Sequence, residues 1–152
     1  MMSSLSIWKT NRAICRDLMS KYSVEQLNIV PPGFGNNLIW NIGHIIIVQQ
    51  RMIYAASGLP INIPEELIGD YKSGTKPSTT DSEERVALLS ELLVSVIPQT
   101  IADAENGVFG EAYKGFTTAT SFSVMSVGDA IAFNTFHEGL HLGAMQAIRR
   151  FL

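Results

Sequence analysis

Apolar residues recur at helical spacing in four segments of the chain, and this periodicity predicts four long helices. The first helix is expected over residues 4–20. The residues expected to face inward from it are Leu5, Trp8, Ile14 and Leu18. A capping box over residues 23–26, with serine first and glutamine last, predicts a further short helical turn. The proline pair and glycine at residues 31–33 should break the chain after it.

The second helix should begin at Asn36 or Asn37, because either side chain can cap it. It is expected to continue to about Ser57. Gly58 and Pro60 follow, and a glycine with a proline just beyond it is the usual stop signal. Residues 59–79 are rich in proline and glycine and predict a long loop. Such a loop can cross the full length of a helix bundle, so the second and third helices need not be antiparallel neighbours.

The third helix should open at Thr80 or Asp81, since Asp81 with Glu84 resembles a capping box. Pro98 should kink or end this helix, because its ring clashes with a preceding carbonyl and it donates no hydrogen bond. Residues 105–125 predict irregular structure or a short hairpin, being rich in glycine, threonine, serine and aromatic residues. The fourth helix is expected from Ser126 to about Phe151.

No strand pattern is strong enough to build a sheet, so the predicted fold class is all-α. The most economical architecture is a four-helix bundle with long loops after the second and third helices. A chain of 152 residues with 46% apolar and 16% charged residues can bury a real core, and we expect a single domain over residues 1–152.

Composition and charge indicate which kinds of partner and which cellular compartment to expect. The formal net charge is −3 and no basic block stands out, which argues against nucleic acid as a partner. The N-terminus lacks a secretory pattern, and the most apolar stretch, residues 38–56, is too polar for a membrane span. The single cysteine, Cys15, rules out an internal disulfide, fits a reducing cytoplasm and is expected to be a buried small apolar residue.

The candidate chemistry lies in the three histidines, His44, His137 and His141. His137 and His141 are four residues apart in a predicted helix, so both rings leave the same face one turn apart. A third metal ligand must come from elsewhere, and His44 is the only other histidine. Three neutral imidazoles leave coordination positions open, as in catalytic sites, and they suit zinc, nickel, iron or copper. The alternative is a solvated histidine pair with a separate core histidine.

The spacing of His137 and His141 around Glu138 also matches the His-Glu-x-x-His pattern of zinc proteases. That class normally takes its third ligand from further along the chain. Residues 142–152 contain no histidine, aspartate or glutamate, so a peptidase of this type is disfavoured.

Several neighbours of the histidines are further candidates. Glu138 and Asn134 could hydrogen-bond to the histidines or to a molecule bound at the metal. The alternatives are that Glu138 is a solvated surface residue and that Asn134 is a polar helix residue in contact with water. Trp40 lies one turn before His44 and could wall a pocket, or it could be a core tryptophan. Three helical glycines beside the histidines indicate close packing of backbones, because glycine within a helix costs about 1 kcal/mol relative to alanine. They are Gly43, Gly139 and Gly143.

Two segments resemble a known family. Residues 36–45, NNLIWNIGHI, resemble the second-helix signature of DinB-like proteins, and residues 137–143, HEGLHLG, resemble the last-helix signature. The resemblance implies a four-helix bundle, often a homodimer, in which three histidines hold a divalent metal. Matched by position, those ligands are His44, His137 and His141. One departure is Ala144, which stands where family members often have glutamine.

Characterised relatives in that family include enzymes that use a low-molecular-weight thiol, such as bacillithiol or mycothiol, for S-transfer or isomerisation. The resemblance therefore implies a thiol S-transferase whose partners are a small-molecule thiol and an electrophile. A metal cation favours the thiolate, which is the nucleophilic form of sulfur. A metal-dependent hydrolase and a metal-binding protein without turnover use the same ligands, so the sequence leaves open whether the protein is an enzyme.

Overall fold

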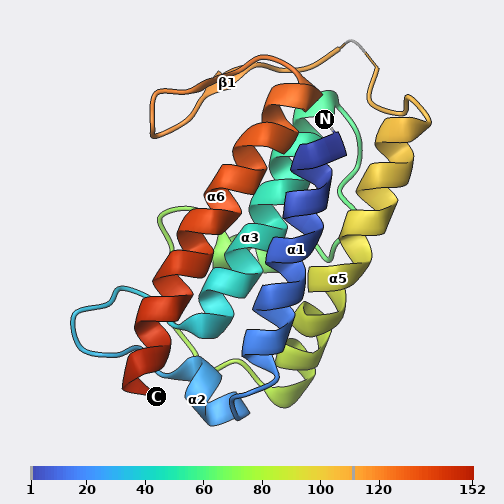
Figure 1. The fold of residues 1–152 in the computed structure, drawn as a ribbon. Coiled ribbons are helices and arrows are strands. Elements are labelled where there is room, and N and C mark those ends of the chain that lie inside the picture. Colours follow the sequence, from blue (N-terminus) through green and yellow to red (C-terminus); the bar gives the residue numbers. More distant parts are fainter. Residues whose placement is uncertain (1, 111) are drawn as a thin grey trace.

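Four long helices make up most of the molecule. The computed structural model describes residues 2–110 and 112–152, with side chains from residue 5 onward. The long helices are α1 (Met2–Met19), α3 (Leu38–Ile53), α5 (Glu83–Glu105) and α6 (Val127–Ile148), and they lie side by side (Figure 1). Helix α6 contacts both α1 and α3, and α5 contacts the same two helices. The all-α class is confirmed.

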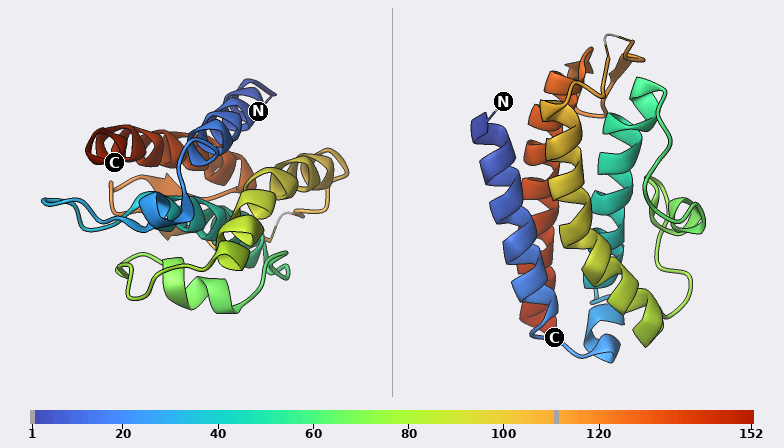
Figure 2. Two further views of the ribbon diagram at one scale, coloured as in Figure 1. Left: turned by 90° about the horizontal axis from the view of Figure 1, so that it is seen from below. Right: turned by 90° about the vertical axis from the view of Figure 1, so that its right-hand side faces the viewer.

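The long helices run in two directions. In Figure 1, α1 and α6 run downward and α3 and α5 run upward, so the second and third long helices are parallel. The connection between α3 and α5 runs back along the length of the molecule, as expected for a loop this long. It contains a short helix that was not predicted, α4 (Glu66–Tyr71), which packs on the outer side of α3, away from α1 (Figure 2). The other short helices are α2 (Val24–Asn28), η1 (Ala55–Ser57) and η2 (Arg149–Phe151).

Polar caps set the helix starts. The Asn37 side chain accepts from the backbone N–H of Trp40, and the capping box before α2 is present as predicted. The α5 cap differs from the expectation: Ser82 caps the helix, while Asp81 accepts a hydrogen bond from the Tyr71 hydroxyl. Pro98 does not end α5, which continues to Glu105. The turns on either side of Pro98 are anchored by buried residues, and that packing outweighs a cost of about 3 kcal/mol.

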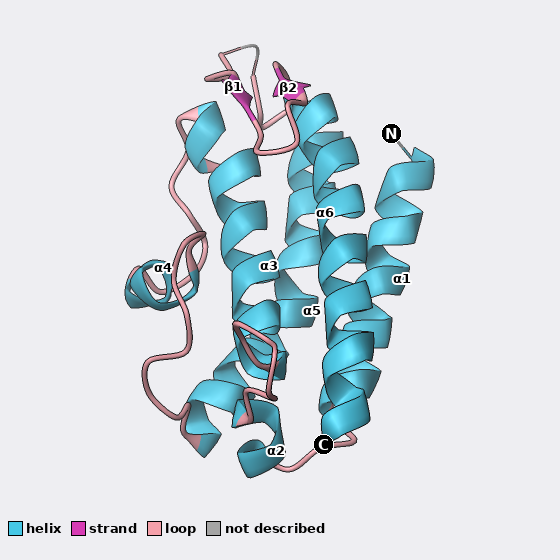
Figure 3. Cartoon of the chain, turned by 90° about the vertical axis from the view of Figure 1, so that its left-hand side faces the viewer, coloured by secondary structure: helices cyan, strands magenta, loops and turns pink. Residues whose placement is uncertain are grey.

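A two-stranded hairpin precedes the last helix. Strand β1 (Phe116–Thr117) pairs antiparallel with β2 (Ser123–Val124), and Phe116 lies opposite Val124. Figure 3 shows the hairpin beside the start of α6. The expectation of irregular structure or a short hairpin in this region is confirmed.

The core contains two apolar clusters with buried polar residues at the level between them. One cluster includes Leu18 of α1, and the other includes Leu5 and Trp8. The prediction that Ile14 faces inward is wrong, because it is 39% exposed while its neighbour Cys15 is fully buried. Burial raises the pKa of the Cys15 thiol to about 12, so this cysteine behaves as the predicted small apolar residue.

Helix α5 is apolar overall. It is long and apolar enough to cross a membrane by length and composition, although core helices of soluble proteins pass the same test. Leu89 and Leu93 are fully buried on the face of α5 that joins the core.

Candidate metal centre

The three histidines converge between α3 and α6. His44 projects from α3, and His137 and His141 project from α6. One ring nitrogen of each residue can be chosen so that all three lie within 4.8 Å of one another. His44 is buried and the other two are half-buried. The structure therefore brings together the three residues that the sequence singled out.

The His44 ring is held by its neighbours on two sides. Its Nδ1 lies 2.7 Å from the backbone carbonyl oxygen of Tyr71, which only accepts, so Nδ1 carries the proton and Nε2 keeps a free lone pair. Trp40 stacks on the ring with centroids 4.7 Å apart and planes 12° apart. The Trp40 indole donates to Thr75 at 3.1 Å. Trp40 is thus both a buried residue and a wall against His44.

Asn41 orients the His141 ring. Its Nδ2 donates to the Asn37 carbonyl at 2.7 Å and to Asn36 Oδ1 at 3.1 Å, which turns the Oδ1 of Asn41 toward His141. His141 Nδ1 donates to that oxygen at 2.7 Å, so the proton sits on Nδ1 and the Nε2 of this ring keeps its lone pair. Sequence reasoning missed Asn41, although its position three residues before His44 placed it on the same helix face.

His137 supplies the third nitrogen. Its Nε2 lies 3.2 Å from the Nε2 of His141. Two ligands at 2.0–2.1 Å from one tetrahedral ion would lie about 3.3 Å apart, so the spacing suits a shared metal. The Nδ1 of His137 is buried and has no hydrogen-bond partner among the described residues. Three imidazoles with ligand nitrogens this close together form a donor set that fits a divalent transition metal.

Burial keeps the three imidazoles neutral. Desolvation lowers the pKa of His44, while its hydrogen bond to the Tyr71 carbonyl partly opposes the shift. Desolvation, with repulsion from His44 and Arg12, lowers the pKa of His137 to about 4. Desolvation, with repulsion from the other two histidines, lowers the pKa of His141 to about 3. Metals bind neutral imidazole, so near neutral pH these groups need not lose a proton first.

The Glu138 carboxylate faces the core. It is fully buried and forms an ion pair with Arg12 at 2.7 Å, so the surface-glutamate reading is wrong. Trp8 Nε1 donates to it at 2.6 Å and Asn134 Nδ2 donates to it at 2.9 Å. Asn134 is buried as well, so it is not a solvated helix residue. Among the described residues, neither Glu138 nor Asn134 forms a hydrogen bond with a histidine.

Arg12 extends the buried polar group across the core. Its guanidinium also donates to the carbonyls of Leu93 at 3.1 Å and Ile45 at 3.2 Å, and to Gln49 Oε1 at 3.4 Å. One side chain from α1 therefore ties α3, α5 and α6 together. This arrangement fixes how α6, which carries two of the histidines, sits against α3.

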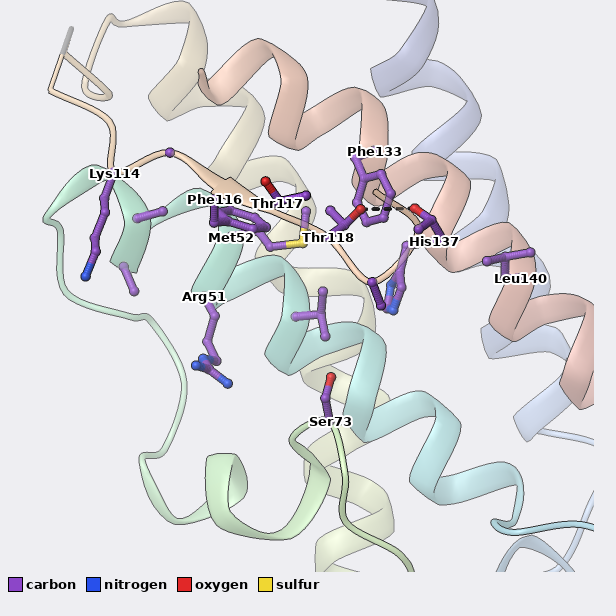
Figure 4. Close-up of a pocket in the computed structure, with 16 residues that line it drawn as sticks. Arg51, Met52, Ser73, Lys114, Phe116, Thr117, Thr118, Phe133, His137 and Leu140 are labelled. Carbon is purple, nitrogen blue, oxygen red and sulfur yellow. Dashed lines mark hydrogen bonds between the residues drawn. The ribbon is translucent and has the colours of Figure 1, made fainter. Parts of the chain in front are cut away.

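A cavity of about 580 Å³ opens beside His137 (Figure 4). His137 and Leu140 of α6 line one part of it, and the hairpin residues from Phe116 to Thr120 line another. Neither His44 nor Trp40 lines this cavity. His137 is therefore the member of the histidine group that faces space of small-molecule size.

The sequence was compared with family models and with curated proteins. A family model described as the DinB superfamily matches residues 7–145. The chain belongs to the DinB superfamily. The matched range contains both histidine segments, which confirms the resemblance read from residues 36–45 and 137–143. No curated protein matched this DinB chain.

Only one of the three glycines singled out in the DinB chain is needed for close packing. A Cβ on Gly43 would lie 2.5 Å from ring atoms of Tyr71, the residue whose carbonyl orients His44. A Cβ on Gly139 or Gly143 would meet nothing within 4 Å among the described residues. The packing prediction holds for Gly43 and is wrong for the other two.

Replacing Gly43 by alanine should destabilise this DinB protein by about 1–3 kcal/mol, because the Tyr71 ring must move off α3. Replacing Gly139 by alanine is the matched control. It should stabilise the protein by about 0.5–1 kcal/mol, since its site is an open helix surface. Urea unfolding of both variants measures the difference. Equal effects of the two substitutions would contradict the close contact at Gly43.

Acid should weaken the metal-free DinB protein. An unfolded histidine has a pKa near 6.5, whereas folded His137 and His141 protonate only near 4 and 3. Below pH 6.5 the unfolded state binds protons that the folded state does not, so the free energy of unfolding falls as pH falls toward 4. Urea unfolding at pH 7 and pH 5 measures this fall. A variant with both residues changed to glutamine should show a smaller one.

Proposed function

We propose that this DinB-superfamily protein is a metal-dependent thiol S-transferase that joins a small-molecule thiol to an electrophile. His44, His137 and His141 would hold one divalent ion, zinc, nickel or iron. The observation that carries the proposal is the convergence of three neutral imidazoles beside a cavity of about 580 Å³. Three protein nitrogens leave coordination positions for an exogenous group, as in catalytic metal sites.

The divalent ion, when bound, would favour the deprotonated form of a sulfur nucleophile. The side chains and backbone orient the ligands and leave space for the substrate. Asn41 and the Tyr71 carbonyl hold two imidazoles so that each keeps its lone pair on Nε2, and His137 faces the cavity. In the transfer the thiol proton goes to solvent and sulfur forms a bond to the electrophilic carbon. The bond from that carbon to its leaving group breaks, and the leaving group departs with the electron pair.

One observation favours transfer over hydrolysis. A zinc-protease-like hydrolase would use the glutamate after the first histidine as general base. Here Glu138 is fully buried and bonded to Arg12, Trp8 and Asn134. None of the described residues that line the cavity is acidic, so the described lining offers no carboxylate to activate water. A thiol has an ordinary pKa of about 8.5, against about 15.7 for bulk water, so it loses its proton to solvent without such a base.

Three broader features complete the proposal. The four long helices would form a four-helix bundle of the DinB type, which their mutual contacts support. Two copies would form a homodimer, and the protein would act in the cytoplasm, which the single buried cysteine suits. The thiol would be a bacillithiol-like cofactor, as in characterised relatives of DinB-like proteins.

The test uses zinc-loaded protein with 1-chloro-2,4-dinitrobenzene as electrophile and bacillithiol, cysteine or glutathione as thiol. Product should form faster than without protein. The rate should fall at least tenfold after metal removal and in His137→Ala. Asn106→Ala, an exposed residue at the end of α5, is the control and should keep the full rate. An undiminished rate in His137→Ala overturns the proposal. Hydrolysis of an ester in the absence of thiol would indicate a metal-dependent hydrolase instead. Bound metal with neither activity would indicate a metal-binding protein without turnover.

A further inference from the structure

The cavity beside His137 has a strongly basic end. Arg51 and Lys114 both line it, and the described lining contains no acidic side chain. Within the described residues, neither cation forms an ion pair with a carboxylate, whereas Arg12, Lys21 and Arg85 each have one. Both side chains are exposed, so their charges are available to a bound molecule. This part of the cavity therefore carries uncompensated positive charge.

The cavity is also polarised along its length. Figure 4 shows Arg51 and Lys114 on one side and His137 with Phe133 on the other, with Met52 and Phe116 between them. A molecule that spans this space would meet two cations, then an apolar surface, then a histidine of the candidate metal centre. The volume of about 580 Å³ lies within the range typical of small-molecule sites.

The fold brings the two cations together from two separate segments of the chain. Arg51 lies in the last turn of α3. The segment that carries Lys114 is bonded to the last turn of α3 and to η1, which follows it: the Tyr113 hydroxyl donates to the Met52 carbonyl at 2.7 Å, and the Lys114 N–H donates to the Ala56 carbonyl at 2.7 Å. Two hydrogen bonds thus hold the Lys114 backbone beside the Arg51 turn. The pairing of the cations follows from tertiary structure.

We infer that this cavity binds an organic anion, with its negative group at Arg51 and Lys114 and its apolar body along Met52 and Phe116. Arginine binds carboxylate, sulfonate and phosphate oxygens through a planar fork of donors, and lysine adds a mobile charge. The reacting end of the molecule would reach His137, and only that assignment rests on the proposed S-transfer. The anion site rests on the cavity and its charges alone.

The test compares two probes that differ by one charged group. 8-Anilinonaphthalene-1-sulfonate is anionic, and N-phenyl-1-naphthylamine has nearly the same apolar body without the charge. Their fluorescence is titrated with metal-free and zinc-loaded protein. The sulfonate should bind more tightly than the neutral probe, and its advantage should shrink as salt rises. Arg51→Gln and Lys114→Gln should each weaken sulfonate binding roughly 2- to 5-fold and leave the neutral probe unchanged.

Two controls locate the effect. Lys9→Gln and Arg16→Gln remove equivalent charges from exposed positions on α1 and should leave both probes unchanged. Ala55→Trp places a large side chain in the cavity lining and should weaken both probes. Competition by 3-phenylpropionate and by phenyl phosphate then shows whether the site prefers a carboxylate or a phosphate.

The inference is overturned if the two probes bind equally to the wild-type protein. It is also overturned if Arg51→Gln and Lys114→Gln behave like the α1 variants, or if Ala55→Trp leaves binding intact. Because the titration needs neither metal nor turnover, its outcome is independent of the S-transfer assay. Charge-dependent binding without thiol transfer would support the anion site and contradict the proposed reaction. Thiol transfer without charge-dependent binding would support the reaction and contradict the anion site.

Discussion

Replacing Glu138 by glutamine should destabilise the protein by about 3–5 kcal/mol. Arg12 is 2% exposed and Glu138 is fully buried, so the substitution leaves the guanidinium charge in the core without its counter-ion. The Trp8 indole also loses a charged acceptor at 2.6 Å. Urea unfolding at pH 7 measures the change in the free energy of unfolding.

The double variant Arg12→Met/Glu138→Gln is the control. Removing the unpaired charge should recover much of the lost stability, because an apolar side chain can fill the volume of a buried charge. The two substitutions should therefore be strongly non-additive, since the residues are in direct contact. A cost below about 1 kcal/mol for Glu138→Gln alone would contradict the importance of this ion pair.

Metal affinity separates two roles for Glu138. If the carboxylate only holds α6 in place, folded Glu138→Gln should bind zinc as tightly as the wild type. If it also supports the histidines, as its position beside His137 suggested, the affinity should fall by roughly 10- to 100-fold. The hydrogen bonds of Glu138 to Trp8, Arg12 and Asn134 favour the first result.

Local sequence signals predicted the features that depend on nearby residues. The cap at Asn37 and the box before α2 each need only a few residues, and both are present. His137 and His141 share a face because helical geometry requires it. His44 joins them through the packing of α3 on α6, which the family resemblance implied and spacing alone did not.

Contacts between distant segments account for what was missed. Glu138 is buried because Arg12 reaches it from 126 residues away. The partner of His44 is a backbone carbonyl at Tyr71, which carries no side-chain signal. Helix α4 has six residues, too few for an apolar period to stand out between proline and glycine residues. Each of these features arises from tertiary packing, which overrides weak local preferences.

Zinc-loaded protein should retain about one ion per chain after dialysis, and retention should fall close to zero when any of His44, His137 or His141 is replaced by alanine. Each substitution leaves two protein ligands, too few to hold the ion against dialysis. Mass spectrometry of dialysed protein measures the content. Full retention in His44→Ala would show that the three nitrogens that lie within 4.8 Å do not form one site.

Asn41→Ala is expected to weaken zinc binding without abolishing it. The variant keeps all three ligands but removes the oxygen that accepts from His141 Nδ1 at 2.7 Å, so the ring loses its fixed tautomer and orientation. Loss of such a partner typically costs 10- to 100-fold in affinity, or about 1.4–2.7 kcal/mol. Competition with a chelating dye gives the dissociation constants, and Asn106→Ala serves as the matched asparagine control. An Asn41→Ala affinity equal to that of the control would mean that the metal alone orients His141.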